Sequence, residues 1–207
     1  METIRYAIAV MLITFIPAAI LFWCIVHPFA QFWRKFGRSR SYRVICSLLV
    51  VVMLLLFLAR QRLLACSWPG HPALDVAGVA CLILSGWLRL RIAPHLPVRL
   101  LVGMPELAAT RETELVTAGI YGRIRHPRYL QMDLALTGYA MIARYPAAYW
   151  ALCLWLIGIR FVVFLEEREL LRRFGDEYRR YCEQVPRFIP KFSAGMPSPP
   201  PPEDGDA

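Results

Sequence analysis

The sequence contains few of the patterns that metal and redox sites require. Its six cysteines form no C-x-x-C pair, and most of them lie in or beside apolar segments, where a free thiol acts as a small hydrophobic group. Its four histidines are separated from one another and have no ligand-like spacing. We therefore assign no site to the cysteines and expect no metal centre.

Acidic residues are also scarce, because 15 aspartates and glutamates face 24 lysines and arginines, which leaves a net charge of +9. The basic residues gather between apolar blocks, where they attract anionic lipid headgroups. A membrane therefore explains the charge, and we expect no nucleic-acid partner.

Apolar residues make up 57% of the chain, and the mean hydropathy is +0.44. They form blocks close to the roughly 20 residues that one membrane crossing needs. We predict an all-α integral membrane protein with about five transmembrane helices, of which the second and fourth are short. The helices are expected at Tyr6–Val26, Val44–Ala59, Ala73–Leu90, Leu130–Ala143 and Ala147–Leu165. The first block is too long for a signal peptide and lacks an A-x-A cleavage site.

The positions of the basic residues predict the orientation. The segments after the first, third and fifth apolar blocks hold 19 lysines and arginines, whereas the other side holds four. Because basic residues are retained in the cytoplasm, the N-terminus is expected outside and the C-terminus inside.

A polar stretch, LVTAGIYGRIRHPRY, directly precedes the fourth apolar block. Gly119, Tyr121 and Gly122 favour a turn, and Pro127 is well placed in the first turn of a helix. The helix N-terminus and the nearby arginines suit a carboxylate or phosphate. We call residues 115–129 the cassette; its alternative interpretation is a basic anchor at the membrane surface.

Two ionisable residues lie inside apolar blocks, Asp133 and Arg160. Asp133 is one helical turn beyond Tyr129, and Arg160 is seven residues before Glu167, so each pair shares a helix face. Because the two helices run antiparallel from the same surface, we expect an ion pair and a cavity lined by all four side chains. A purely structural ion pair is the alternative.

The twin acid, Glu166 and Glu167, follows the fifth apolar block. Acids at a helix end oppose the helix dipole, so a cation or a ligand should compensate them. An ammonium group or a ribose diol is the functional option, and neutralisation by surface arginines is the alternative. Gly175 and Asp176 indicate a stop and a new helix cap, hence two short amphipathic helices. Residues 193–207 are predicted to be a disordered tail.

The cassette, the twin acid and the closing stretch FGDEYRRYCEQVPRFIP resemble the isoprenylcysteine carboxyl methyltransferase and phospholipid N-methyltransferase superfamily. The likeness covers about the C-terminal 40% of the chain. It implies one membrane domain over residues 1–192, with N-terminal helices at 1–92 and a cofactor-binding region at 115–190. The last helix pair, the preceding loop and the C-terminal helices would form a cytoplasmic pocket for S-adenosylmethionine.

The resemblance also implies roles for individual residues. The expected cofactor-binding residues are Gly119, Tyr121, Arg125, His126, Tyr129, Glu166 and Glu167. Arg160, Glu167 and Asp133 are the expected catalytic residues beside a lipophilic acceptor, which would be an isoprenylcysteine-type carboxylate, a lipid amine or a thiol. An amine acceptor must lose a proton, whereas a thiolate or carboxylate needs no base.

One position departs from the superfamily pattern RHPxYxG, because Gln131 stands where the final glycine is usual. A side chain there puts the cofactor geometry or the substrate path in question. Two other functions therefore remain as alternatives: a membrane reductase of the sterol-reductase type that uses NADPH, and a non-catalytic membrane scaffold.

Overall fold

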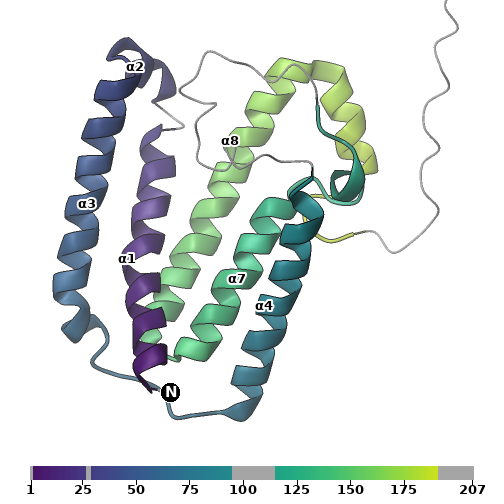
Figure 1. The fold of residues 1–207 in the computed structure, drawn as a ribbon. Coiled ribbons are helices and arrows are strands. Elements are labelled where there is room, and N and C mark those ends of the chain that lie inside the picture. The colour runs from purple at the N-terminus through teal and green to yellow at the C-terminus, as the bar shows by residue number, and fades with distance from the viewer. Residues whose placement is uncertain (1, 27–28, 95–114, 191–207) are drawn as a thin grey trace, which may run out of the picture.

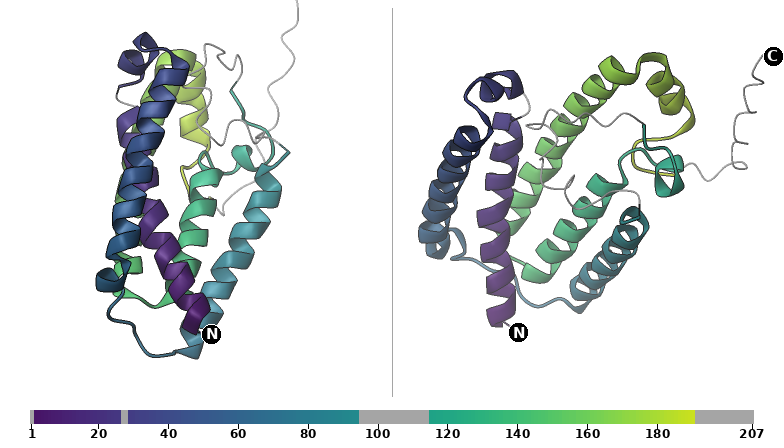
Figure 2. Two further views of the ribbon diagram at one scale, coloured as in Figure 1. Left: turned by 60° about the vertical axis from the view of Figure 1, so that its left-hand side comes forward. Right: turned by 45° about the horizontal axis from the view of Figure 1, so that its top comes forward.

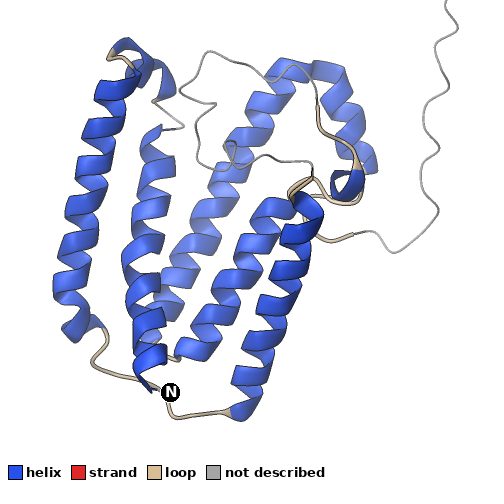
Figure 3. Cartoon of the chain, in the orientation of Figure 1, coloured by secondary structure: helices blue, strands red, loops and turns tan. Residues whose placement is uncertain are grey.

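A computed structural model of the chain describes residues 2–26, 29–94 and 115–190, and all regular structure in these ranges is helical (Figures 1 and 3). This confirms the predicted all-α fold class. The elements are α1 (Glu2–Val26), α2 (Ala30–Lys35), α3 (Arg38–Leu63), α4 (Pro72–Ile92), the 3-10 helix η1 (Gly119–Gly122), α7 (Pro127–Ala143) and α8 (Pro146–Gln184).

Several helices are suited to a membrane. Four of them, α1, α3, α4 and α8, are long and apolar enough to cross a bilayer. The 17 residues of α7 correspond to about 26 Å at 1.5 Å per residue, which is near the lower limit for a crossing. The chain is thus a membrane protein, while the count of five crossings stays a prediction.

The helices lie side by side in the order α3, α1, α8, α7 and α4 (Figures 1 and 2). The main apolar core joins α1, α7 and α8 and is built around residues such as Leu12, Trp155 and Ile159. Two glycines let α4 and α7 approach closely. A Cβ atom on Gly138 would lie 2.7 Å from the Gly78 carbonyl oxygen, so neither glycine tolerates a side chain without a shift of the backbone.

The two helices that were predicted to be short are both longer in the structure. The helix predicted at Val44–Ala59 runs from Arg38 to Leu63, because the arginines that flank the apolar run are good helix formers. The helix predicted from Leu130 already begins at Pro127. This start agrees with the expectation that Pro127 lies in the first turn of a helix. Neither helix is therefore as short as the apolar runs alone indicate.

The predicted end of the last helix at Leu165 is wrong, because α8 continues through Glu166 and Glu167. Its uninterrupted part, residues 146–174, corresponds to about 44 Å at 1.5 Å per residue, more than the roughly 30 Å of apolar bilayer. The backbone leaves helical geometry only at Gly175 (φ 54°, ψ −121°). The predicted break at Gly175 is therefore confirmed, and a second helical segment follows it. The prediction was wrong for the segment before the break, which continues the apolar helix without interruption, since the Leu, Glu and Arg residues after Leu165 favour helix.

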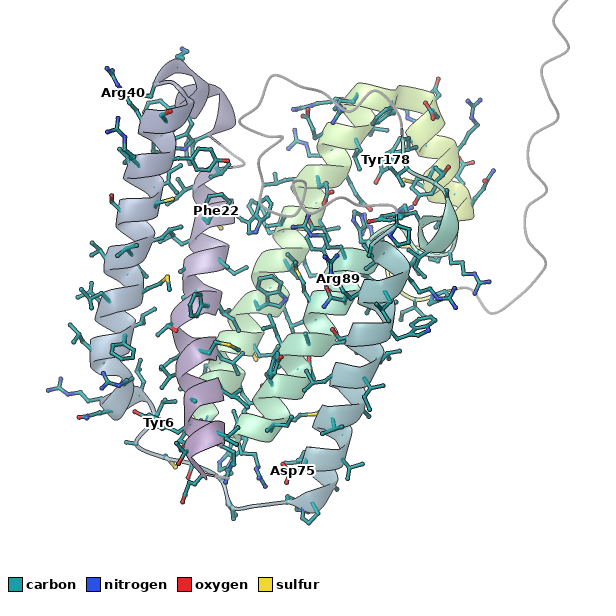
Figure 4. The ribbon with its side chains drawn as sticks, in the orientation of Figure 1. Tyr6, Phe22, Arg40, Asp75, Arg89 and Tyr178 are labelled. Atoms are coloured by element: carbon teal, nitrogen blue, oxygen red, sulfur yellow. The ribbon has the colours of Figure 1, made fainter. Side chains whose placement is uncertain are left out.

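Two ends of the bundle are used below. The cassette end holds the cassette, the twin acid and the bend of α8, and the turn end holds the α7–α8 turn, the start of α1 and residues 64–71 (Figure 1). Figure 4 shows Tyr178 at the cassette end and Tyr6 and Asp75 at the turn end. The predicted tail at 193–207 lies outside the described residues, as do Arg99, Arg111 and Lys191.

Candidate functional site

The cassette folds as the predicted turn followed by a helix start. Gly119 has a positive φ of 62°, and a Cβ atom on Gly122 would lie 3.2 Å from the Thr117 carbonyl oxygen. The turn is closed by η1, and His126 directly precedes Pro127 at the start of α7. The glycines therefore let the backbone of residues 117–122 turn tightly shortly before α7 begins.

The chain after α8 returns to pack against the cassette. The backbone N–H groups of Arg125 and His126 donate to the carbonyl oxygens of Pro186 and Arg187, at 2.8 and 3.0 Å. The Arg125 side chain donates through Nη1 to the carbonyl oxygens of Cys182 (2.8 Å) and Val185 (3.0 Å). We call residues 185–188 the C-terminal strap. The strap holds the cassette in place through contacts between residues that are about 60 positions apart in the sequence.

The predicted amphipathic end of α8 packs against the same region. Tyr178, Tyr181 and Val185 are buried and contact Leu115 and Phe174. The Tyr181 hydroxyl also donates to the Tyr121 carbonyl oxygen at 2.7 Å. The apolar side of this segment thus covers the cassette.

Glu167 is held by two arginines and a histidine. Its Oε1 accepts from Arg125 Nη2 at 3.0 Å, from His126 Nε2 at 3.2 Å and from Arg187 Nε at 3.0 Å. Arg187 Nη2 donates to Oε2, so this arginine binds both carboxylate oxygens. The hydrogen bond from Arg187 to Glu167 stabilises the guanidinium and raises the pKa of Arg187. The predicted need for cationic compensation of the twin acid is met at Glu167.

Glu166 has a different environment, although it is the next residue. Its side chain is 37% exposed, against 12% for Glu167. Its Oε2 atom is buried but has no hydrogen-bond partner in the part of the chain that the structure describes, and His126 Nδ1 lies 4.0 Å away. The two acids thus flank the His126 ring. Both carboxylate oxygens of Glu167 accept hydrogen bonds, whereas Glu166 Oε2 accepts none from the described residues.

A cavity of about 140 Å³ opens beside Glu166. Aromatic rings, arginines and one carboxylate share its lining, which suits a ligand that carries both a flat ring and charged groups. Its lining includes Leu115, Tyr121, Arg125, His126, Arg128, Tyr129, Glu166, Arg173, Phe174, Tyr178 and Tyr181.

Most of the expected cofactor-binding residues meet at this cavity: Tyr121, Arg125, His126, Tyr129 and Glu166 line it. Gly119 instead lines a second cavity, of about 490 Å³, between the end of α4 and η1. Trp87, Arg91 and Arg123 are among its other lining residues. Glu167 faces the strap and lines neither of the two cavities.

The predicted ion pair between Asp133 and Arg160 forms, with 2.8 Å between Oδ2 and Nη2. Trp155 Nε1 donates to Asp133 Oδ1 at 2.8 Å. Asp133 is buried, whereas the Arg160 side chain is 48% exposed, and its guanidinium lies 4.2 Å from the centre of the Phe188 ring. Tyr129, Asp133, Arg160 and Glu167 were expected to line one cavity, but Asp133, Arg160 and Glu167 line neither of the two cavities described here. Of these four, Tyr129 lines the cavity beside Glu166.

Gln131, the departure from the superfamily pattern, points toward α4. Its Nε2 donates to Ser85 Oγ at 2.8 Å, and Ser85 Oγ donates to the Gln131 carbonyl oxygen at 2.9 Å. Gln131 is not among the residues that line the cavity beside Glu166. The extra side chain is thus accommodated between two helices.

Arg187 and Phe188 were missed by sequence reasoning. The stretch that contains them was part of the superfamily resemblance, but no single residue of it suggested a role. Their contacts with Glu167, His126 and Arg160 depend on the return of the strap to the cassette. The local spacing of residues in the sequence does not indicate that the strap folds back onto the cassette.

Comparison with known families gives one match, to the family model described as phospholipid methyltransferase, over residues 74–177. These residues make up half of the chain and include most of α4, all of η1 and α7, and α8 through the twin acid to just beyond its bend. The strap lies beyond them. Neither the curated proteins nor the solved structures contain a match.

Proposed function

The chain belongs to the phospholipid methyltransferase family, and on this premise we propose that it transfers a methyl group from S-adenosylmethionine to a lipophilic acceptor. Membership of the family implies a membrane methyltransferase. The identity of the methyl donor, the acceptor and the roles of single residues are the content of the proposal.

The environment of Glu166 Oε2 is the observation that carries the proposal. A buried carboxylate oxygen without a partner is costly, and a ligand that donates a hydrogen bond removes this cost. S-Adenosylmethionine has suitable donors in its ribose hydroxyls and its ammonium group. Aromatic side chains in the same cavity suit the flat adenine ring.

Other cassette residues fit the remaining groups of this donor. Arg125 Nε is buried, has no hydrogen-bond partner among the described residues, and belongs to a side chain that lines the cavity. We assign it to the carboxylate of the methionine moiety, since a charged donor binds a carboxylate strongly. His126, Tyr129 and Tyr121 would form the walls, Gly119 would shape the turn, and Glu167 would hold His126 and Arg125 in place.

Asp133 and Arg160 are proposed to act on the acceptor side, whereas Glu167, which was expected to be catalytic as well, keeps the positioning role given above. The cofactor supplies an activated methyl group on its sulfonium, and no covalent enzyme intermediate is needed. The protein must align the acceptor and exclude water, and such positioning lowers a barrier by about 7 to 11 kcal/mol in favourable cases. The half-exposed Arg160 guanidinium suits an anionic part of the acceptor, while Asp133 fixes its orientation.

The acceptor class and the orientation are also proposed. The family description favours a phospholipid, and a lipid amine would need to lose a proton before methylation. An isoprenylcysteine-type carboxylate and a thiol are the other acceptor classes. The excess of basic residues favours a cytoplasmic cassette end and an outer N-terminus.

Calorimetric titration of S-adenosylmethionine into the detergent-purified protein tests the methyl donor. We expect micromolar binding that is lost in a Glu166→Ala, Glu167→Ala double variant and kept in Arg179→Gln, which changes an exposed ion pair nearby. NADPH is titrated in parallel. A folded wild-type protein that ignores S-adenosylmethionine contradicts the proposal, and NADPH binding favours a reductase.

Transfer of a tritiated methyl group tests the reaction itself. The purified protein is incubated with labelled S-adenosylmethionine and, separately, with phosphatidylethanolamine, a farnesylated cysteine analogue or an alkyl thiol. Label in the organic extract with one acceptor class identifies that class. Tight donor binding without transfer to any of the three would remove the acceptor part of the proposal.

A further inference from the structure

We infer that Arg187 is a positioning residue that holds Glu167 and the C-terminal strap against the cassette, so that Glu166 is the acid presented to the cavity. This inference rests on the proposed function. It concerns a residue outside the stretch that matches the family model, and its contacts come from the fold alone.

Backbone hydrogen bonds fix the strap to the cassette independently of the Arg187 side chain. Pro186 and Arg187 accept hydrogen bonds from the cassette backbone at 2.8 and 3.0 Å. These bonds place the Arg187 side chain beside Glu167, where its guanidinium binds both carboxylate oxygens. Such two-point geometry is the strong form of an arginine–carboxylate pair.

Arg187 differs from the other two partners of Glu167. Arg125 and His126 line the cavity beside Glu166, whereas Arg187 does not line it and its side chain is largely exposed. Arg187 therefore has no route to a ligand in that cavity except through Glu167. For this reason we assign it a positioning role.

The bond from Arg187 to Glu167 Oε2 fixes the orientation of the Glu167 carboxylate. Arg187 Nη2 donates to Oε2, while Arg125 and His126 both donate to Oε1. Without Arg187, the carboxylate is free to rotate and to take up a different pairing with Arg125 and His126. Because His126 lies between the two acids, its displacement changes the position of the ring next to Glu166.

Phe188 extends the effect toward the acceptor side. Its ring centre lies 5.9 Å from that of His126 and 4.2 Å from the Arg160 guanidinium carbon. One residue of the strap thus lies beside both His126, which lines the cavity, and Arg160 of the Asp133–Arg160 pair. A loosened strap is expected to disturb both places.

The test compares Arg187→Gln, Arg187→Lys and the matched control Arg179→Gln, which breaks an exposed ion pair with Asp176 in the last segment of α8. Binding of S-adenosylmethionine is measured by calorimetry, and thermal unfolding is recorded for each variant. We expect Arg187→Gln to weaken binding roughly tenfold, with a smaller loss for lysine, because lysine keeps the charge but not the two-point geometry. The control should bind like the wild type.

A double-mutant cycle with Glu167→Gln separates positioning from a general loss of stability. If Arg187 acts through Glu167, adding Arg187→Gln to Glu167→Gln causes little further loss of affinity. Additive losses would overturn the inference, and so would wild-type affinity in Arg187→Gln. If the glutamine variant does not fold, unchanged affinity in Arg187→Lys overturns the inference instead.

The outcome for the wild type distinguishes the two proposals. Binding by the wild type together with an unaffected Arg187→Gln variant removes the positioning role and leaves the methyltransferase function intact. Failure of the folded wild type to bind S-adenosylmethionine removes the proposed function, and the positioning role is then lost with it.

Discussion

The two ends of the bundle each hold a charged centre, but the charges are reversed. At the cassette end, the Glu167 carboxylate is surrounded by two arginines and a histidine. At the turn end, the Arg144 side chain is 3% exposed, and its guanidinium pairs with the Asp75 carboxylate at 3.2 Å. Arg144 also has a left-handed backbone, with φ 59°.

The surroundings of the two centres differ. At the turn end, the bonds tie three segments together: Trp68 N–H donates to the Arg144 carbonyl oxygen, and Arg5 donates to the carbonyl oxygens of Ala143 and Trp68. Both cavities described above lie at the cassette end. Buried side-chain atoms without a hydrogen-bond partner among the described residues occur at both ends, on Arg144 and on Glu166, but Glu166 also lines a cavity. For this reason the proposed ligand site is placed at Glu166.

Replacement of Glu167 at the cassette end should have the largest effect on stability and on binding of S-adenosylmethionine. Glu167→Ala leaves Arg125, Arg187 and His126 without their common partner, which is expected to cost about 3 to 5 kcal/mol of stability. It should also abolish detectable binding of S-adenosylmethionine. Thermal unfolding and calorimetry measure the two effects.

The exposed Glu169, two residues further along α8, is the matched control. Glu169→Ala is expected to keep both stability and binding. Equal behaviour of the two variants would show that the contacts of Glu167 are unimportant.

Removal of the cation at the turn end should reduce stability without affecting the ligand. Arg144→Leu leaves Asp75 unpaired, and a loss of about 2 kcal/mol corresponds to a fall in Tm of roughly 4 to 8 °C for a chain of this size. The folded variant should bind S-adenosylmethionine as tightly as the wild type. Weakened binding would show that the two ends are coupled.

A change between the two ends should affect the reaction more than the binding of the methyl donor. Arg160→Gln removes the guanidinium that pairs with Asp133, and we expect methyl transfer to fall about tenfold, equivalent to 1.4 kcal/mol. Affinity for S-adenosylmethionine should stay unchanged. The exposed Arg168 provides the control variant Arg168→Gln, and a loss of donor binding in Arg160→Gln alone would move Arg160 to the cofactor side.

The smallest effect on stability and donor binding is expected from a change of Gln131, which stands at the superfamily's glycine position. Gln131→Gly removes the hydrogen bond to Ser85 and introduces glycine into α7, at a cost of about 1 kcal/mol each at most. Binding of S-adenosylmethionine should not change, since Gln131 points toward α4. Gln131→Ala separates the lost hydrogen bond from the flexibility of glycine, and tighter donor binding in either variant would contradict this orientation.

Sequence reasoning predicted those features that depend on local order along the chain. The turn at Gly119, the helix start at Pro127 and the Asp133–Arg160 pair follow from glycine, proline and helical spacing, and all are present. The break at Gly175 was also predicted, but the continuation of α8 from Leu165 to Phe174 was not, because polarity marks the edge of a bilayer and not the end of a helix.

The unequal environments of the twin acid were also beyond reach of the sequence. Glu166 and Glu167 are adjacent and chemically alike, so only their partners distinguish them. One of those partners, Arg187, comes from a strap that returns across the cassette. Contacts of this kind depend on the whole fold, and no helical or strand period indicates them.

The most direct test compares one isosteric change of an acid at each end by calorimetric titration of S-adenosylmethionine. Glu166→Gln keeps the size of the side chain that lines the cavity, and Asp75→Asn does the same for the partner of Arg144. We predict that Glu166→Gln weakens binding at least tenfold, a loss of about 1.4 kcal/mol, while Asp75→Asn binds like the wild type. Equal affinities for the wild type and Glu166→Gln would contradict a methyl-donor site at Glu166.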